Sequence, residues 1–408
     1  MFRPVRRAIW MALIALACST RKEASPAIAA ARGAPPPAAV RTDVGASERG
    51  QSHPVPCLPS EPYASAGALA DEARNALAKN AGERAVACAD EALRLAPRLV
   101  AALSARADAL AALGKLDEAR LAFARALAVD PTDPEALLGA AELHVRRLGP
   151  ARDALEAGLE YALRGARIAN ARKDRSLAAR LVLMAGMAEN DLGRSHLALA
   201  HLEKAVAALP DDPDVVYERG VALFELCRFQ DAERSFARAL ALSPEDAWAM
   251  HQLGLLAERR GDRARAESLL ARARKLAPDD FPPELAVDEA AFRGEVQSAI
   301  AGLPEAERRV LAKVPLDIQD LPDANDLVSV DPPLSPSILG LFRGPAENEP
   351  CTAADGPRCR SIVIYRKNLV RFARDRRELD EQVRVTLLHE LGHLHGENDD
   401  ELRARGLE

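Results

Sequence analysis

The sequence predicts two folded regions, a long all-helical repeat solenoid followed by a small α+β domain. Its 408 residues exceed one ordinary domain. Hydrophobic residues make up 48% of the chain, but aromatic residues make up only 4%. Ala and Leu supply most of the apolar side chains, which favours closely packed helices over a large sheet. A 34-residue period and a change of pattern after Pro278 separate the two regions.

The charge pattern excludes one class of partner. The formal net charge is −6, and acidic and basic residues are mixed along the chain rather than gathered in blocks. A nucleic-acid-binding protein needs a basic patch or stripe, which is absent from this sequence. We therefore expect no nucleic-acid partner.

The first residues have the pattern of an export signal. A basic start is followed by the apolar run 8–17, which is long enough for a signal-peptide core but too short to span a membrane. We expect residues 1–17 to be a signal peptide; the alternative is a cytoplasmic protein with an apolar first helix. Residues 18–62 are rich in Ala, Pro, Ser and Gly, cannot bury enough surface to fold, and are expected to form a disordered tether.

The end of the apolar run, Ala15-Leu16-Ala17-Cys18, resembles a bacterial lipoprotein box. The resemblance implies that Cys18 is lipidated and holds the chain on the membrane by a lipid anchor alone. Ser19 after it implies sorting to the outer membrane of the cell envelope. Because Ala15-x-Ala17 also suits an ordinary signal peptidase that cuts the same bond, a secreted form is the alternative.

The middle of the chain repeats with a fixed register. Pro210, Pro244 and Pro278 are spaced by 34 residues. Small residues recur at fixed distances before these prolines, where paired helices must approach closely, and a large apolar residue fills the next turn. The small residues are Ala205, Ala239 and Ala273, then Ala198, Ala232 and Ala266, then Gly186, Gly220 and Gly254; the large ones are Leu202, Phe236 and Leu270.

This register resembles that of tetratricopeptide repeats. The resemblance is strong over 179–212, 213–246 and 247–280 and extends to 66–99 and 100–133. A tetratricopeptide solenoid is therefore expected over residues 63–281. The resemblance implies that the array binds a protein partner along its concave groove; the alternative is that it only spaces or stabilises the neighbouring domain.

The groove is expected to be largely apolar. Its inward-facing positions are predicted at Leu183 and Met187, Tyr217 and Val221, and His251 and Leu255. Cys88 and Cys227 lie on repeat helices and are predicted to be small buried residues without a reactive role.

After Pro278 the pattern changes, and residues 282–408 are expected to form a separate domain. Helices are predicted over 284–300, 304–313 and 377–395, and strands over 315–320, 338–342 and 361–365. On the last helix, Val383, Leu387, Leu391 and Leu394 form one stripe that should face the core.

The last helix carries the strongest chemical signal. His389 and His393 are four residues apart, so both imidazoles lie on one helical face and can bind a single Zn²⁺, with Glu390 beside them as general base. Gly396 lets the chain leave the helix in a left-handed conformation, so Asp399 can turn back as the third ligand. This arrangement is typical of hydrolysis by zinc with an open coordination position.

The string His-Glu-x-x-His-x-x-Gly-x-x-Asp resembles the motif of metzincin peptidases, and residues 289–405 resemble minimal matrix-metalloprotease-like domains. The resemblance implies an α+β zincin that cleaves a protein or peptide substrate, with zinc on His389, His393 and Asp399 and Glu390 as the base. No methionine follows the motif, so a Met-turn is absent. The alternatives are Asp400 as the third ligand, and a non-catalytic scaffold lipoprotein with a degenerate metal-binding domain.

Two further predictions concern this domain. Cys351 and Cys359 bracket a polar segment between two predicted strands and should form a disulfide in an exported chain. Tyr365 either helps stabilise an oxyanion or, as is more common for a strand tyrosine, packs in the core.

Overall fold

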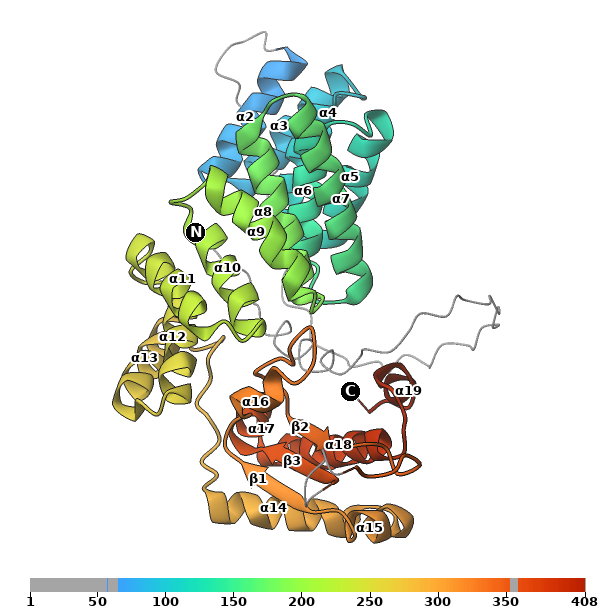
Figure 1. Cartoon of the computed structure of the whole chain (residues 1–408). Coiled ribbons are helices and arrows are strands. Elements are labelled where there is room, and N and C mark those ends of the chain that lie inside the picture. The colour runs from blue at the N-terminus through green and yellow to red at the C-terminus, as the bar shows by residue number, and fades with distance from the viewer. Residues whose placement is uncertain (1–56, 58–64, 353–358, 408) are drawn as a thin grey trace, which may run out of the picture.

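The structure is a computed structural model, and it describes residue 57, residues 65–352 and residues 359–407. It contains a solenoid of paired helices followed by a small domain with three strands, as the sequence predicts (Figure 1). The predicted signal peptide, Cys18 and all of the predicted tether except Cys57 lie outside the described residues. Within the described part of the chain, no helix is long and apolar enough to cross a membrane.

Among the described residues twelve helices form the solenoid, and each packs mainly on its neighbours in the chain. They are α2 (Ala66–Ala78), α3 (Gly82–Leu95), α4 (Val100–Ala112), α5 (Leu116–Val129), α6 (Pro134–Arg146), α7 (Arg152–Ala171), α8 (Arg175–Asp191), α9 (Ser195–Ala208), α10 (Pro213–Glu225), α11 (Phe229–Leu242), α12 (Ala247–Arg259) and α13 (Arg263–Leu276). Several begin at an Asp whose side chain accepts a hydrogen bond from the first turn, as Asp246 does from the backbone of Ala249 at 3.1 Å.

The glycines of the repeats lie where one helix presses on the next. A Cβ at Gly220 would lie 2.6 Å from Cε1 of Phe236, and one at Gly186 would lie 2.6 Å from Cγ of Leu202. A larger residue has no room at either position. The predicted pairing of a small residue with a large apolar one is therefore confirmed.

Most of the positions predicted to face the groove are buried. Leu183, Met187 and Tyr217 are each no more than 5% exposed and pack in the core, whereas His251 and Leu255 line a cavity. The reason is the small size of their neighbours, which lets the helices close on one another.

The interpretation of Cys88 also needs correction. Cys88 is fully buried, as predicted, but it forms a disulfide with Cys57, which fixes that part of the predicted tether to α3. Cys227 is a free thiol and half-buried, and its Sγ donates a hydrogen bond to the carbonyl of Leu334 at 3.6 Å. Burial raises its pKa to about 12, which agrees with the predicted lack of reactivity.

The C-terminal domain is a three-stranded sheet packed against helices. Its elements are α14 (Glu289–Gly302), α15 (Glu305–Leu311), β1 (Leu316–Gln319), α16 (Ala324–Leu327), β2 (Gly340–Arg343), β3 (Ser361–Tyr365), α17 (Arg366–Phe372), α18 (Arg376–Leu394) and α19 (Asp399–Ala404). The sheet order is β1-β3-β2, with β1 parallel and β2 antiparallel to β3. The first helix begins later than predicted because Asp288 caps it.

The core of this domain forms around α18. The predicted stripe is buried, with Val383 and Leu387 fully inaccessible and Leu391 1% exposed. Phe292 and Val296 of α14 pack in the same cluster, so this helix belongs to the domain. The stripe therefore anchors α18 on the core of the domain.

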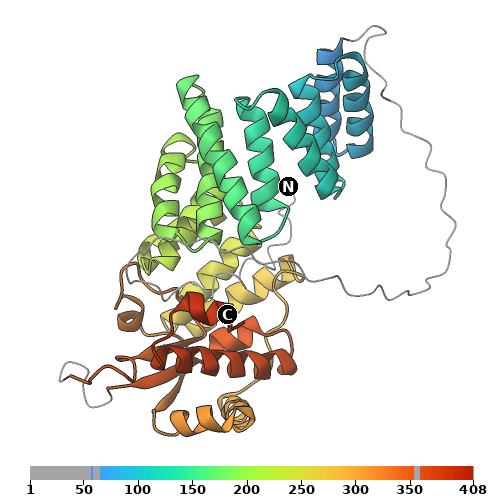
Figure 2. The same ribbon diagram turned by 90° about the vertical axis from the view of Figure 1, so that its right-hand side faces the viewer.

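The domain lies against the last repeats (Figures 1 and 2). Glu258 of α12 pairs with Lys367 at 3.0 Å and with Arg371 at 2.5 Å, both on α17. Arg259 donates to the carbonyl of Pro322 at 2.6 Å. These three contacts attach the domain to the end of the solenoid.

Candidate metal centre

Two short segments bring the predicted ligands together. His389 and His393 lie one turn apart near the end of α18, which leaves its helical path at Gly396 with a φ of +90°. Asn398 then caps α19, whose first residue is Asp399. The left-handed glycine predicted from the sequence is what turns the aspartate back toward the two histidines.

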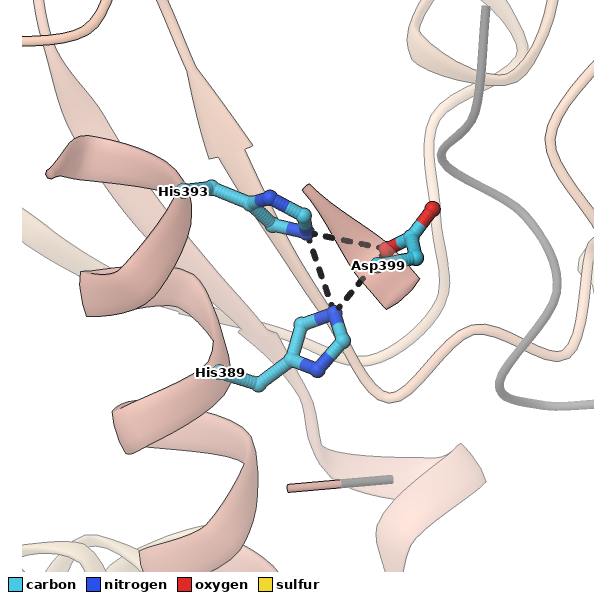
Figure 3. A group of neighbouring side chains, drawn as sticks. All are labelled: His389, His393 and Asp399. Carbon is cyan, nitrogen blue, oxygen red and sulfur yellow. Dashed lines mark hydrogen bonds and ion pairs between the residues drawn. The ribbon is translucent and has the colours of Figure 1, made fainter. Parts of the chain in front are cut away.

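The three side chains converge on one point (Figure 3). The two Nε2 atoms are 3.0 Å apart, and Oδ1 of Asp399 lies 3.6 Å from Nε2 of His389 and 3.4 Å from that of His393. A tetrahedral zinc with ordinary bond lengths needs ligand atoms about 3.3 Å apart. The distances therefore fit zinc, and this is the one such group among the described residues.

The outer ring nitrogens explain why the inner ones are available. The Nδ1 of His389 lies 2.7 Å from the carbonyl oxygen of Leu407, and that of His393 lies 3.0 Å from the carbonyl oxygen of Glu397. A neutral imidazole that donates from Nδ1 keeps a lone pair on Nε2. The sequence motif gave no signal for these two carbonyls, because backbone acceptors carry no side-chain signature.

A bound cation would give the carboxylate of Asp399 and the inner nitrogens of the two histidines a common partner. Asp399 is 6% exposed, and neither of its carboxylate oxygens has a hydrogen-bond partner among the described residues. In the metal-free chain burial opposes protonation of His389, but Asp399 and Glu390 outweigh it and raise its pKa to about 9. A bound metal would replace that proton.

Glu390 lies behind the ligands, in contact with the sheet. It is 5% exposed, and a Cβ at Gly340 of β2 would lie 2.8 Å from its Oε1 and 2.6 Å from Cγ2 of Thr386. Burial raises the pKa of the Glu390 carboxyl, against the opposing effect of His389 and His393. A glycine at 340 is therefore part of the site, although the sequence analysis assigned it no role.

The structure distinguishes the alternatives for neighbouring residues. Asp400 points to solvent and pairs with Arg403 at 2.6 Å, so it does not join the cluster. Tyr365 is fully buried in the core with Val363, which fits the packed alternative.

The segment next to the site is held by a disulfide. Cys351 and Cys359 are bonded, as predicted, and the backbone N–H of Glu347 donates to the carbonyl of Leu394 at 2.7 Å. Arg360 donates to the carbonyls of Pro345 and Ala346, both at 2.9 Å. The backbone bonds hold residues 345–347 beside the end of α18.

Comparison with known families agrees with this geometry. Residues 311–407 match the model of zincin-like metallopeptidases, and residues 100–143, 183–247 and 223–283 match models of tetratricopeptide repeats. The chain is a tetratricopeptide-repeat protein with a zincin-like metallopeptidase domain. In this zincin-like domain the matched residues include all three metal-ligand candidates and Glu390.

Several solved structures resemble the repeat region. PilF of Pseudomonas aeruginosa is 17% identical, with 52% of this chain and 92% of that one covered and a TM-score of 0.45. A thermophilic TPR protein of Thermus thermophilus is 22% identical, with 51% and 100% covered and a TM-score of 0.39. YrrB, a TPR protein with an unusual peptide-binding site, is 20% identical, with 47% and 93% covered and a TM-score of 0.35. No curated protein matches the chain.

Proposed function

We propose that this protein is an exported zinc-dependent peptidase that cleaves protein or peptide substrates in the bacterial cell envelope. The observation that carries the proposal is the convergence of three metal-ligating atoms, within 4.8 Å of one another, beside a buried carboxylate. A structural metal site is usually closed by four protein ligands, whereas three ligands leave a position for chemistry. Zinc held there would act as a Lewis acid on water and on the substrate carbonyl.

Each nearby residue has a role in this proposal. The carbonyls of Leu407 and Glu397 orient the imidazoles of His389 and His393. Glu390 takes a proton from the attacking water at its carboxylate and later delivers it to the leaving amine. Its raised pKa suits this work, because a carboxyl that holds its proton more strongly is a better base and can still act as an acid.

Substrate recognition is assigned to the sheet and to the repeats. Within the described residues β2 is an edge strand that pairs with β3 alone, and it contacts Glu390 through Gly340. An extended peptide that adds to this edge would pass close to the metal centre. Tetratricopeptide repeats are protein-binding modules, and we assign this array the recruitment of a protein partner or substrate. Because most of the predicted groove positions are buried, that partner binds elsewhere on the array.

Export and anchoring rest on sequence alone. We propose that the signal peptide is cut before Cys18 and that this cysteine carries a lipid in the outer membrane. The described disulfides Cys57–Cys88 and Cys351–Cys359 support an oxidising compartment. In a bacterial host, labelled lipid should enter the wild-type protein but not the Cys18→Ser variant; equal labelling would refute the anchor.

The peptidase is tested with the purified full chain, a broad peptide mixture and mass-spectrometric detection of new termini. Cleavage should stop with o-phenanthroline, continue with its non-chelating isomer m-phenanthroline, and return when zinc is restored. Cleavage that persists in the chelator would contradict a metal mechanism. A zinc-loaded chain that cleaves no peptide would instead favour the alternative of a non-catalytic scaffold.

A further inference from the structure

A cavity lies between the last repeat and the C-terminal domain, and none of its lining residues belongs to the metal centre. It has a volume of about 380 Å³. One wall is a single face of α12 that includes Trp248, His251 and Leu255, and the opposite wall includes Val370 and Phe372 of α17. Both regions of the protein therefore build this cavity, at the junction seen in Figures 1 and 2.

The floor of the cavity is aromatic and uncharged. The Phe281 ring stacks on His251 with centroids 4.4 Å apart and meets Trp248 edge-on at 4.8 Å. Burial lowers the pKa of His251 to about 3, so its imidazole is neutral near pH 7. An apolar group can therefore enter without displacing a charge.

Two of the arginines that line the cavity, Arg371 and Arg374, are paired with carboxylates. Arg371 pairs with Glu258 at 2.5 Å and with Glu284 at 3.3 Å. Arg374 pairs with Glu378 at 2.9 Å. Their charges are neutralised within the protein, so they do not call for an external anion.

Arg274 of α13 differs from these cations. Its Nε is buried and has no hydrogen-bond partner among the described residues. A buried donor without a partner is unfavourable, and a guanidinium binds a carboxylate through two parallel hydrogen bonds. The cavity thus combines an apolar floor with a guanidinium whose buried Nε has no partner among the described residues.

We propose that this cavity is a binding site for a small amphiphilic monocarboxylate, with its apolar part on the Trp248–Phe281 floor and its carboxylate on Arg274. The volume falls in the range of about 300 to 1,000 Å³ that is usual for small-molecule sites, which occur preferentially at domain interfaces. This function is separate from peptide cleavage and does not depend on the metal centre.

The chain contains its own reporter for this site. It has two tryptophans, Trp10 and Trp248. Trp10 lies in the predicted signal peptide, so Trp10→Phe makes Trp248 on the cavity floor the only tryptophan whether or not that peptide is removed. We would titrate the full-length Trp10→Phe protein at neutral pH with decanoate, which is ionised, and with decanamide, which is neutral. Both compounds are transparent at the wavelengths used.

Decanoate should cause a saturable change and bind more tightly than decanamide. Arg274→Gln should lower the affinity for decanoate by at least about tenfold and leave the affinity for decanamide nearly unchanged, because only the carboxylate pairs with the positive charge. Arg274→Lys, which keeps the charge, should retain part of the preference for the acid. Arg272→Gln, an exposed arginine on the same helix, is the matched control and should change neither.

Three results would overturn the proposal. One is the absence of a saturable fluorescence response to decanoate in the parent protein. Another is an equal loss of affinity for decanoate in Arg274→Gln and Arg272→Gln. The third is binding of a capped peptide with adjacent Phe and Asp when decanoate does not bind, which would assign the cavity to a protein partner.

Discussion

The repeats and the zincin-like domain use the same packing device for different ends. In the repeats, Gly220 lets Phe236 press against its backbone, and the contact fills a core. In the domain, Gly340 admits the side chain of Glu390 in the same way, and the contact positions a carboxylate beside a metal site. Close approach at a glycine therefore supports stability in one region and chemistry in the other, and substitutions should separate the two.

The largest effect should come from the metal ligands. His393→Ala removes one of three protein ligands, so zinc content should fall well below one per chain and turnover by about three orders of magnitude or more. Asp399→Asn should have an intermediate effect, because it weakens metal binding and leaves Glu390 in place. Elemental analysis and peptide cleavage measure both; a His393→Ala chain with full zinc would place the metal elsewhere.

Gly340→Ala should reduce turnover more than it reduces stability. The new Cβ would meet Thr386 and Oε1 of Glu390, and a displacement of about 1 Å at a catalytic group can cost about a hundredfold in rate. Zinc content should stay near one. Gly294→Ala, in open space on α14 of the same domain, is the control and should keep full turnover; equal rates for both variants would remove Gly340 from the site.

Gly220→Leu should reduce stability more than it reduces turnover. Overpacking against Phe236 should lower the free energy of unfolding of the repeat region by about 1 to 3 kcal/mol, with little change in zinc content or turnover. Gly67→Leu, at an exposed position, is the matched control, because a Cβ there would meet only Oγ of Ser65 at 3.8 Å. Denaturant unfolding measures both. A Gly220→Leu protein that keeps its stability but loses activity would contradict a purely structural role for Gly220.

The smallest effect concerns a buried acid of the repeats. Burial raises the pKa of Glu225 to about 7, against a hydrogen bond from Ser335 of the C-terminal domain. Between about pH 4.5 and pH 7 the folded chain keeps a proton on Glu225 that the unfolded chain has released. The free energy of unfolding therefore falls as the pH rises through this range. Its contribution should fall by roughly 2 kcal/mol between about pH 5 and pH 8.

Glu225→Gln should remove that part of the pH dependence. The difference in unfolding free energy between wild type and variant is the quantity to measure, because it cancels the opposite pH dependence of metal binding. A difference that stays constant from acidic to mildly alkaline pH would show that Glu225 does not retain its proton in the folded chain.

The sequence predicted best what depends on local spacing. The repeat register, the stripe on α18 and the turn at Gly396 each follow from residues close in the chain, and the structure confirms them. The pairing of Cys351 with Cys359, which closes a short loop, was predicted for the same reason.

Features that depend on distant residues were missed. Cys57 and Cys88 are 31 residues apart, and the low-complexity composition around Cys57 concealed its partner. The carbonyl of Leu407 and the backbone of Gly340 reach the site through folding of the whole domain, which motif spacing does not encode. The burial of the predicted groove likewise follows from packing between helices rather than from any one of them.

The most direct test of a zinc peptidase compares wild type with Glu390→Gln, using Glu381→Gln, an exposed change on the same helix, as the control. Glutamine keeps the size of Glu390 but cannot accept the proton of the attacking water. Zinc should stay near one per chain in all three proteins, while cleavage falls by roughly two to four orders of magnitude in Glu390→Gln alone. Cleavage by Glu390→Gln at the wild-type rate would contradict the assignment of Glu390 as the base and, with it, the proposed peptidase.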